Sequence, residues 1–202
     1  MKSPYLARHS IKLAIGWTGL LIMTGLMTHT TISQAQSLPT ASPSPKMIVT
    51  VLPGSWSNGI IEADSKFNCT GDTILIGRSH YGDENKPTKY KCGTATQFGR
   101  PVTLSDKVTS DGMKEAYSSY TCPTNTVMTG REHDSDENGT TRYECAKATG
   151  ELGPLQVAPG AWSENQAESD SSFECAANTV LIGRAHDDDE NGSTRVLCAT
   201  LW

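Results

Sequence analysis

The chain has 202 residues and holds 17 Lys and Arg against 22 Asp and Glu, a net charge of −5. All the acidic residues follow residue 35, so residues 36–202 alone carry 14 basic and 22 acidic side chains. This balance argues against nucleic acid or an anionic membrane surface as a partner, since both require cationic faces.

Residues 1–35 are predicted to be a secretory signal. Three basic residues precede the apolar run 13–28, which is short for a membrane span. Ser33 and Ala35 then place small side chains before the expected cleavage point, after residue 35. The alternative is an uncleaved membrane anchor. Cleavage predicts a secreted or periplasmic protein with no membrane span.

Residues 36–46 form a Pro/Ser-rich linker, and three copies of one unit follow it at 47–99, 100–152 and 153–202. Each copy contains a 24-residue segment that runs from one Cys to the next. The three segments start 53 residues apart, and ten of their 24 positions are identical in all three. A constant period of this length indicates a repeat architecture.

Within each copy the pattern predicts strands. Copies one and three open on a β-branched run with Pro-Gly and a Trp (Trp56 and Trp162), both of which are missing from 101–109 in copy two. An aromatic residue precedes the first Cys, a short apolar run closed by Gly-Arg follows, and a Thr-rich strand leads to the second Cys. Asn-Gly in the acidic loops of copies two and three predicts type I′ hairpin turns.

No window has a helical apolar period, so residues 47–202 are predicted to be all-β. Three tandem repeats of about four strands each favour one pseudo-threefold closed unit, similar to a β-trefoil or β-prism, because closure removes exposed sheet edges. The alternative is a row of three small modules.

The six Cys are expected to form disulfides, because an exported chain with an even number of Cys is typical of a disulfide framework. Six Cys allow fifteen pairings. One pair in each copy favours Cys69–Cys92, Cys122–Cys145 and Cys175–Cys198. The short C-x₂₋₄-C spacing of zinc thiolate sites is missing from the chain.

The order of features from Cys to Cys resembles the repeats of dermatopontin-type extracellular proteins: an aromatic residue, Cys, an apolar run, an acidic polar loop and the second Cys. The resemblance covers the Cys-to-Cys cores, which do not contain the Asp-Arg-x-x-Trp signature that those repeats carry. It implies an extracellular adhesive or glycan-binding module.

The acidic loops of copies two and three match the first six positions of a calcium-binding EF-hand loop, D-x-[DN]-x-[DN]-G. The candidate calcium ligands are Asp134, Asp136, Asn138, Asp187, Asp189 and Asn191. Cys occupies the twelfth position, where a true EF-hand has Glu, so only a shortened calcium loop is expected. The alternative is a solvated hairpin tip whose side chains bond their own backbone. Copy one is not expected to bind calcium.

A Gly-Arg-x-His element recurs in every copy, with Arg and His on one face of a strand. In one hypothesis each copy forms a polar sugar-binding pocket beside a Trp platform. The candidate ligand-binding residues are Arg78, His80, Asp83, Asn85, Arg131, His133, Arg184 and His186. In a second, each Arg pairs with Asp or Glu of its own loop. In a third, the three His meet and bind zinc.

These features favour a secreted multivalent binding protein, lectin-like or otherwise acting in cell-surface recognition, with calcium as its candidate cofactor, because repeated weak sites gain avidity. Its expected partner is a glycan or a cell-surface protein. The alternative is a disulfide-rich interaction protein, such as a protease inhibitor or virulence partner, that uses one surface loop. A metal-dependent hydrolase ranks third, since no G-x-S-x-G, H-E-x-x-H or phosphate loop is present and an enzyme is not expected.

Overall fold

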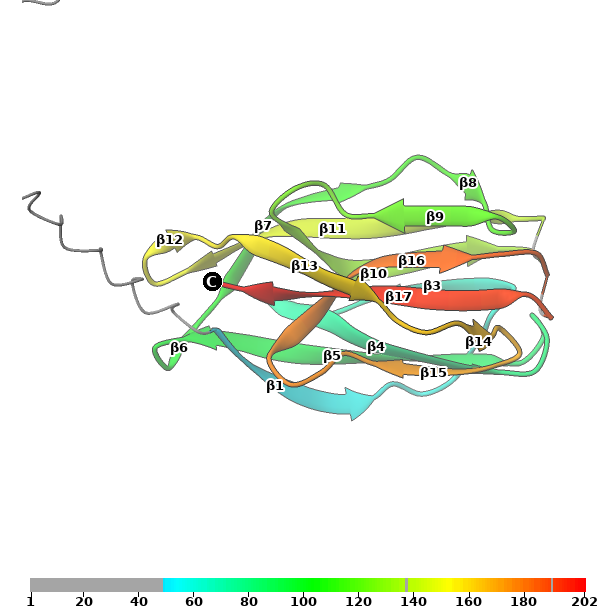
Figure 1. Cartoon of the computed structure of the whole chain (residues 1–202), viewed down its shortest axis with the longest axis horizontal. Coiled ribbons are helices and arrows are strands. Elements are labelled where there is room, and N and C mark those ends of the chain that lie inside the picture. The colour runs from blue at the N-terminus through cyan, green and yellow to red at the C-terminus, as the bar shows by residue number, and fades with distance from the viewer. Residues whose placement is uncertain (1–48, 137, 190) are drawn as a thin grey trace, which may run out of the picture. The chain divides into compact units, whose positions relative to one another are not determined.

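The structure is a computed structural model that describes residues 49–136, 138–189 and 191–202. The signal and the linker expected over residues 1–46 lie outside this part of the chain. All regular elements in the described part are strands, so the all-β prediction is confirmed (Figure 1). No helix there has the length and hydropathy that crossing a membrane requires.

The described residues contain seventeen strands, which form three antiparallel sheets. The first has the order β1-β5-β4-β15, with β2 and β6 also paired to β5. Its strands are β1 Val49–Trp56, β2 Ile60–Ile61, β4 Thr73–Tyr81, β5 Pro87–Gln97, β6 Arg100–Pro101 and β15 Asp170–Glu174.

The second sheet has the order β12-β11-β10-β3, with β7 and β8 also paired to β11. Its strands are β3 Asp64–Asn68, β7 Thr103–Thr109, β8 Met113–Lys114, β10 Thr126–Asp134, β11 Thr140–Gly150 and β12 Gly153–Pro154. The third has the order β13-β17-β16-β9, with β14 also paired to β17. Its strands are β9 Ser118–Thr121, β13 Val157–Trp162, β14 Gln166–Ala167, β16 Thr179–His186 and β17 Ser193–Leu201.

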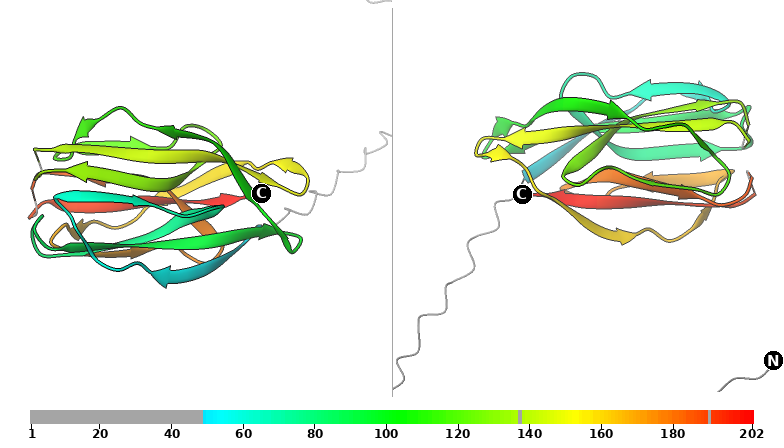
Figure 2. Two further views of the ribbon diagram at one scale, coloured as in Figure 1. Left: turned by 180° about the vertical axis from the view of Figure 1, so that it is seen from behind. Right: turned by 90° about the horizontal axis from the view of Figure 1, so that it is seen from above.

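Each sheet takes one strand from another copy of the repeat. Strand β3 of copy one pairs with β10 of copy two, β9 of copy two pairs with β16 of copy three, and β15 of copy three pairs with β4 of copy one. The three acceptor strands β4, β10 and β16 also contact one another. Figure 2 shows the sheets around this centre from two further directions. No copy therefore completes its sheet alone.

The core lies where the inner faces of the three sheets meet. Leu75, Met128 and Leu181 occupy corresponding positions of the three acceptor strands and are almost fully buried. Rings also stack between sheets within one copy, with Phe67 of β3 on Tyr90 of β5 at 4.6 Å and Tyr120 of β9 on Tyr143 of β11 at 4.7 Å between ring centroids. These contacts partly bury the aromatic residue that precedes the first Cys of copies one and two, and stacking contributes beyond the area buried.

The Gly-Arg pair that closes each apolar run lies inside a strand. Strand β4 runs through Gly77 and Arg78 to Tyr81, and its register to β5 shifts between Leu75 and Gly77. A Cβ on Gly77 would lie 2.9 Å from the carbonyl oxygen of Phe173. The glycine therefore permits the close approach of the strand donated by copy three. The register shift is a β-bulge, which changes the direction of the side chains that follow.

The Asn-Gly turns also differ from the prediction. Type I′ turns require positive φ at both central residues, but Gly139 and Gly192 do not have positive φ. Positive φ occurs instead earlier in each loop, at Ser135 and Asp188. The glycines are needed for space, because a Cβ on Gly139 would lie 1.7 Å from the carbonyl oxygen of Asp134.

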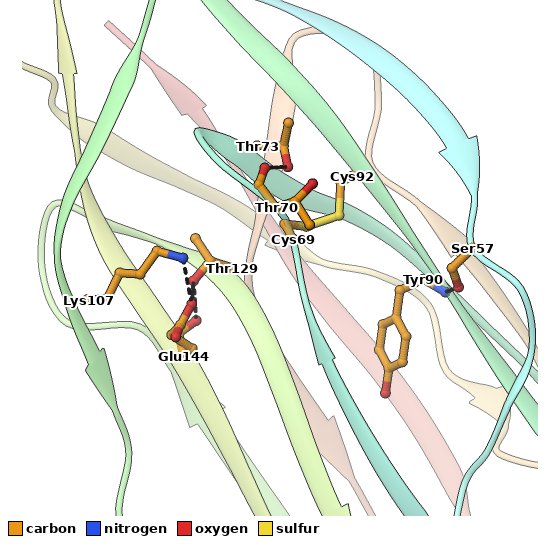
Figure 3. The surroundings of a disulfide bond; sticks show 9 residues. All are labelled: Ser57, Cys69, Thr70, Thr73, Tyr90, Cys92, Lys107, Thr129 and Glu144. Carbon is orange, nitrogen blue, oxygen red and sulfur yellow. Dashed lines mark hydrogen bonds and ion pairs between the residues drawn. A yellow bond between two sulfur atoms is a disulfide. The ribbon is translucent and has the colours of Figure 1, made fainter.

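The three disulfides pair as the repeat predicts: Cys69–Cys92, Cys122–Cys145 and Cys175–Cys198. Cys69 directly follows β3 of the second sheet, whereas Cys92 lies in β5 of the first. Figure 3 shows this bridge with Thr129 and Glu144 of copy two in its surroundings. The backbone N–H of Cys69 donates to the carbonyl of Thr129 at 2.8 Å. Each disulfide thus fastens the chain where it passes from one sheet to the next.

Replacing Cys122 and Cys145 together with Ala is expected to lower the free energy of unfolding by about 3 kcal/mol, because the bridge closes a loop with a sequence separation of 23. Denaturant unfolding under non-reducing conditions measures this change. A loss below about 1 kcal/mol would contradict a stabilising role for the bridge.

Candidate functional site

Nine buried charged or titratable residues meet at the centre of the three sheets. This central cluster consists of Glu62, Glu115, Glu168, Arg78, Arg131, Arg184, His80, His133 and His186. The members of each type are spaced 53 residues apart, one from each copy. Each is at most 5% exposed. The cluster is therefore an interior feature shared equally by the copies.

Strand alternation brings the Arg and His inward. In β4, Arg78 and His80 are buried, whereas Ser79 is partly exposed and Tyr81 is exposed. Because successive side chains of a strand point to opposite faces, Arg78 and His80 share the inner face. The same alternation recurs on β10, and on β16 Arg184 and His186 are buried together with Ala185 between them.

Tight turns bring in the glutamates. Glu62 lies between β2 and β3, where its carbonyl accepts a hydrogen bond from the backbone N–H of Ser65 at 3.2 Å. Its own N–H donates to the carbonyl of Lys86, just before β5. Glu115 and Glu168 occupy the corresponding turns, before β9 and β15, and bond in the same way to Gly139 and Gly192. The acidic hairpins thus help to hold the turns that carry the buried carboxylates.

Each arginine of the cluster contacts two glutamates. Arg78 lies 2.9 Å from Glu62 and 2.8 Å from Glu168, and Arg184 lies 2.7 Å from Glu115 and 3.0 Å from Glu168. Arg131 contacts Glu62 and Glu115 and closes the circuit. The result is a ring of alternating charges in which the charges of three Arg cancel those of three Glu.

The ring keeps its charges at neutral pH. Burial alone would raise the pKa of Glu62, but the charges of Arg131 and Arg78 outweigh burial and lower it to about 2. Arg184 and Arg78 likewise outweigh burial at Glu168 and hold its pKa far below the usual range. The glutamates raise the pKa of Arg78 and Arg184, against the effect of burial. The ring is thus a neutral set of buried ions that depend on one another.

The three histidines lie beside the ring and line a small cavity. Each Nδ1 faces a glutamate Oε2, at 4.0 Å for His80 and Glu62, 2.6 Å for His133 and Glu115, and 3.6 Å for His186 and Glu168. The cavity has a volume of about 30 Å³. Its lining consists of Glu62, Glu115, Glu168, His80, His133, His186 and, from the hairpin of copy one, Glu84.

Burial favours the neutral form of two histidines. It lowers the pKa of His80, and Arg78 lowers it further, despite the opposing charge of Glu62. Burial and Arg184 lower the pKa of His186 to about 4. Neutral imidazole is the form that binds metal ions. The three carboxylates also fit a cation, because Glu62, Glu115 and Glu168 offer oxygens within 4.8 Å of one another.

The Arg and His do not form the surface pockets predicted for sugar binding. They lie inside the molecule, whereas Asp83 and Asn85 are on the acidic hairpin of copy one, where the N–H of Asn85 donates to Asp83. The prediction that each Arg pairs with Asp or Glu of its own loop is wrong, since Arg78 pairs with Glu62 and Glu168. The three His do meet, as the zinc hypothesis requires.

The predicted calcium ligands lie at the hairpin tips, in loops that bond their own backbone. The carboxylate of Asp136 accepts the N–H of Asn138, and that of Asp189 accepts the N–H of Asn191. The Oγ of Ser193 donates to the first aspartate of the copy-three loop. The remaining predicted ligands, Asp134, Asn138, Asp187 and Asn191, lie in the same two loops. Calcium binding at these tips stays a prediction.

The aromatic surface near the acidic loops comes from Tyr rather than Trp. Trp56 and Trp162 are partly buried, and each has a cation over its ring, Lys91 at 5.7 Å and Arg195 at 5.3 Å. Tyr81, at the loop end of β4, is 73% exposed, and Tyr117 is 69% exposed. The hydroxyl of Tyr117 donates to Asp188 in the acidic loop of copy three.

Comparison with known protein families, characterised proteins and solved structures gave no match. The resemblance to dermatopontin-type repeats therefore stays a sequence-based expectation.

Proposed function

We propose that the protein is an exported binding protein that recognises a repetitive ligand, such as a surface glycan, through three equivalent hairpins. The arrangement of the hairpins carries this proposal. The β4–β5, β10–β11 and β16–β17 connections all reach the same end of residues 49–202 (Figure 1). Three similar tips on one side suit simultaneous contact with one multivalent target.

The chemistry of this end fits a ligand rich in hydroxyl or amino groups. Acidic side chains such as Asp83, Asp136 and Asp189 lie on the tips and offer hydrogen-bond acceptors. Tyr81 and Tyr117 add exposed aromatic faces beside them. Carboxylates next to an aromatic platform supply both the polar and the stacking contacts that a sugar ring requires. Binding is favoured over catalysis because an acidic hairpin loop recurs in all three copies, whereas catalysis usually needs one asymmetric constellation.

The proposal includes export and a closed architecture. Three disulfides agree with an oxidising compartment outside the cytoplasm. The cyclic donation of β3, β9 and β15 supports one pseudo-threefold unit of the β-prism kind, in which three sheets surround a common axis. Such a unit would hold the three tips at fixed spacing, which raises the effective concentration of the second and third contact.

A glycan array, run with and without calcium, tests the proposed function. We expect binding to surface glycans, and loss of the signal on chelation would assign calcium a role at the tips. No glycan hit in either condition would overturn the glycan proposal.

Replacing exposed aromatic residues with Ala tests which end of the strands binds the glycan. Tyr81→Ala and Tyr117→Ala are each expected to weaken glycan binding by about tenfold, the loss of roughly 1.4 kcal/mol of stacking. Both side chains are exposed, so stability should change little. Phe98→Ala is the matched control, because Phe98 is also exposed but lies in the β5–β6 turn at the opposite end (Figure 1). Equal losses in all three variants would contradict the proposed surface.

Single-copy variants distinguish multivalent recognition from binding by one loop. Asp83→Asn, Asp136→Asn and Asp189→Asn each remove one charge and keep an oxygen for the loop hydrogen bond. Multivalent binding predicts a partial loss of avidity in each variant and a much larger loss when the three are combined. Complete loss from one variant alone would support the rival interaction protein that uses a single loop.

A further inference from the structure

One position distinguishes copy two from the other two copies. Thr109 lies 53 residues after Trp56 and 53 residues before Trp162, so it takes the place of a tryptophan. The register of the strands confirms this correspondence. In each copy this residue faces one residue of the neighbouring strand, which in turn faces a glycine of the acceptor strand. The three sets are Trp56–Lys91–Gly77, Thr109–Glu144–Gly130 and Trp162–Leu197–Gly183.

In copies one and three this place on the sheet holds an indole ring. A Cβ on Gly77 would lie 3.0 Å from Cη2 of Trp56, so the ring packs directly on the sheet at this glycine. Trp162 is also partly buried and packs against the core. A cation lies over each ring, Lys91 over Trp56 and Arg195 over Trp162. The fold therefore accommodates an aromatic ring with a cation beside it at this position.

In copy two a groove lies at the corresponding place. It has a volume of about 280 Å³. Gly130 lies beside it, because this glycine pairs with Asn68 on one side and Glu144 on the other, and both of these residues line the groove. Thr109 lines it as well, and its side chain is much smaller than an indole. The groove is therefore the space that the missing ring leaves open. Its lining includes Lys66, Asn68, Thr109, Glu132, Arg142 and Glu144.

We propose that this groove binds one small aromatic ligand of about the size of an indole. Its ring takes the place that Trp56 and Trp162 fill in the other copies. Arg142 supplies the cation, since it lies 53 residues before Arg195, whose guanidinium is 5.3 Å from the centroid of the Trp162 ring. A guanidinium over the face of an aromatic ring is attracted by the ring, and the attraction grows when water is excluded.

Two carboxylates in the lining define the polar part of the ligand. Glu144 accepts hydrogen bonds from Thr129 Oγ1 at 2.7 Å and from Lys107 Nζ at 3.1 Å, which fix its position (Figure 3). Glu132 pairs with Lys66. Ionised carboxylates only accept hydrogen bonds, so they favour a ring that carries a donor, as the N–H of indole and the O–H of phenol do. The groove is slightly smaller than the pockets of about 300–1,000 Å³ that hold drug-sized ligands, which agrees with a ligand of one or two rings.

Titration of the purified protein with indole, followed in ¹H–¹⁵N spectra, tests this site. We expect saturable binding with a Kd on the order of 1 mM, as a ligand of this size in an open groove allows. The backbone N–H signal of Gly130 should shift. The signals of Gly77 and Gly183 should not, because Trp56 and Trp162 already fill the corresponding places. Phenol and cyclohexanol are matched ligands, with the same ring size and the same hydroxyl, and phenol should bind about fivefold more tightly.

Thr109→Trp restores the side chain of the other copies and should fill the groove. We expect this variant to bind indole at least about tenfold more weakly, with its three disulfides intact. Thr109→Val is the matched control, because Val keeps the shape of Thr and leaves the groove open, so the affinity should stay within about twofold.

The wild-type spectra keep the proposal testable if the Trp variant does not fold. No saturable binding at up to about 10 mM indole, or equal shifts at the three glycines, would overturn the proposal. So would indole binding that survives Thr109→Trp, or equal affinities for phenol and cyclohexanol. The proposed glycan surface lies at the hairpin tips and does not include Thr109, so either proposal can fail without the other.

Discussion

Glu115→Gln is expected to lower the free energy of unfolding by about 3–5 kcal/mol, a large fraction of the stability of a domain of this size. Glu115 pairs with both Arg131 and Arg184, and all three side chains are almost fully buried. The substitution keeps the shape of the side chain and removes its charge. The guanidinium groups of Arg131 and Arg184 then each lose one of their two carboxylate partners. Because both are buried, water cannot solvate the charge that is left uncompensated. Denaturant unfolding at pH 7 measures the loss.

Glu132→Gln is the matched control for that experiment. Glu132 lies on β10, pairs with Lys66 and is partly exposed to solvent. Exposed ion pairs contribute about 0–1 kcal/mol, so the same chemical change should have little effect there. A similar loss in both variants would show that a buried glutamate of the ring contributes no more to stability than a glutamate in an exposed ion pair. A loss below about 1 kcal/mol at Glu115 would show that the neighbouring groups relax around the missing charge.

The ring explains how three copies with few large apolar side chains specify one arrangement. Each Arg contacts the Glu of its own copy and one Glu of another copy; Arg131, for example, pairs with Glu115 of its own copy and Glu62 of copy one. A slipped strand would place a buried charge opposite an apolar residue, which is far more costly than a misplaced methyl group. Buried ions of this kind add little net stability but strongly disfavour alternative packings, and we infer that role here.

The sequence predicted the strands, the period and the three disulfides, because each depends on local pattern or on equal spacing. It did not predict the partners of Arg78, Arg131 and Arg184. The ten identical positions all lie between the two Cys of each copy, whereas Glu62 lies upstream of Cys69. Glu115 and Glu168 follow at the same 53-residue spacing. An alignment of the copies that extends upstream of the first Cys therefore shows a Glu that recurs in all three.

The exchange of strands between copies could not be predicted from the repeat. Strand β3 of copy one has the same alternation whether it pairs with its own β4 or with β10 of copy two, since both edges present equivalent residues. The choice depends on long-range geometry, such as the close approach of the donated strand to Gly77. For the same reason the sequence left open whether the Arg and His face solvent or the interior, because periodicity places them on one face without showing which way that face points.

Acid is expected to unfold the protein well above pH 2. His186 is neutral when buried and has a pKa of about 4, whereas an unfolded histidine takes up a proton near pH 6.5. Between these values the unfolded state binds more protons, so stability falls as the pH falls. A displacement of this size corresponds to about 3 kcal/mol, and the lowered pKa of His80 acts in the same direction.

The glutamates extend the loss to lower pH. Glu62 has a pKa of about 2 in the folded protein against 4.5 for a glutamate exposed to water, so the stability it contributes above pH 4.5 disappears as the pH falls toward 2. This adds about 3 kcal/mol, and Glu115 and Glu168, whose pKa values are also lowered, act in the same window. Urea unfolding in EDTA from pH 7.5 to 3 should show a decline that begins near pH 6.5 and steepens below 4.5. Constant stability down to pH 4 would contradict the conclusion that these histidines are buried in the neutral form. As a control, the hairpin variant Asp136→Asn should follow the wild-type curve.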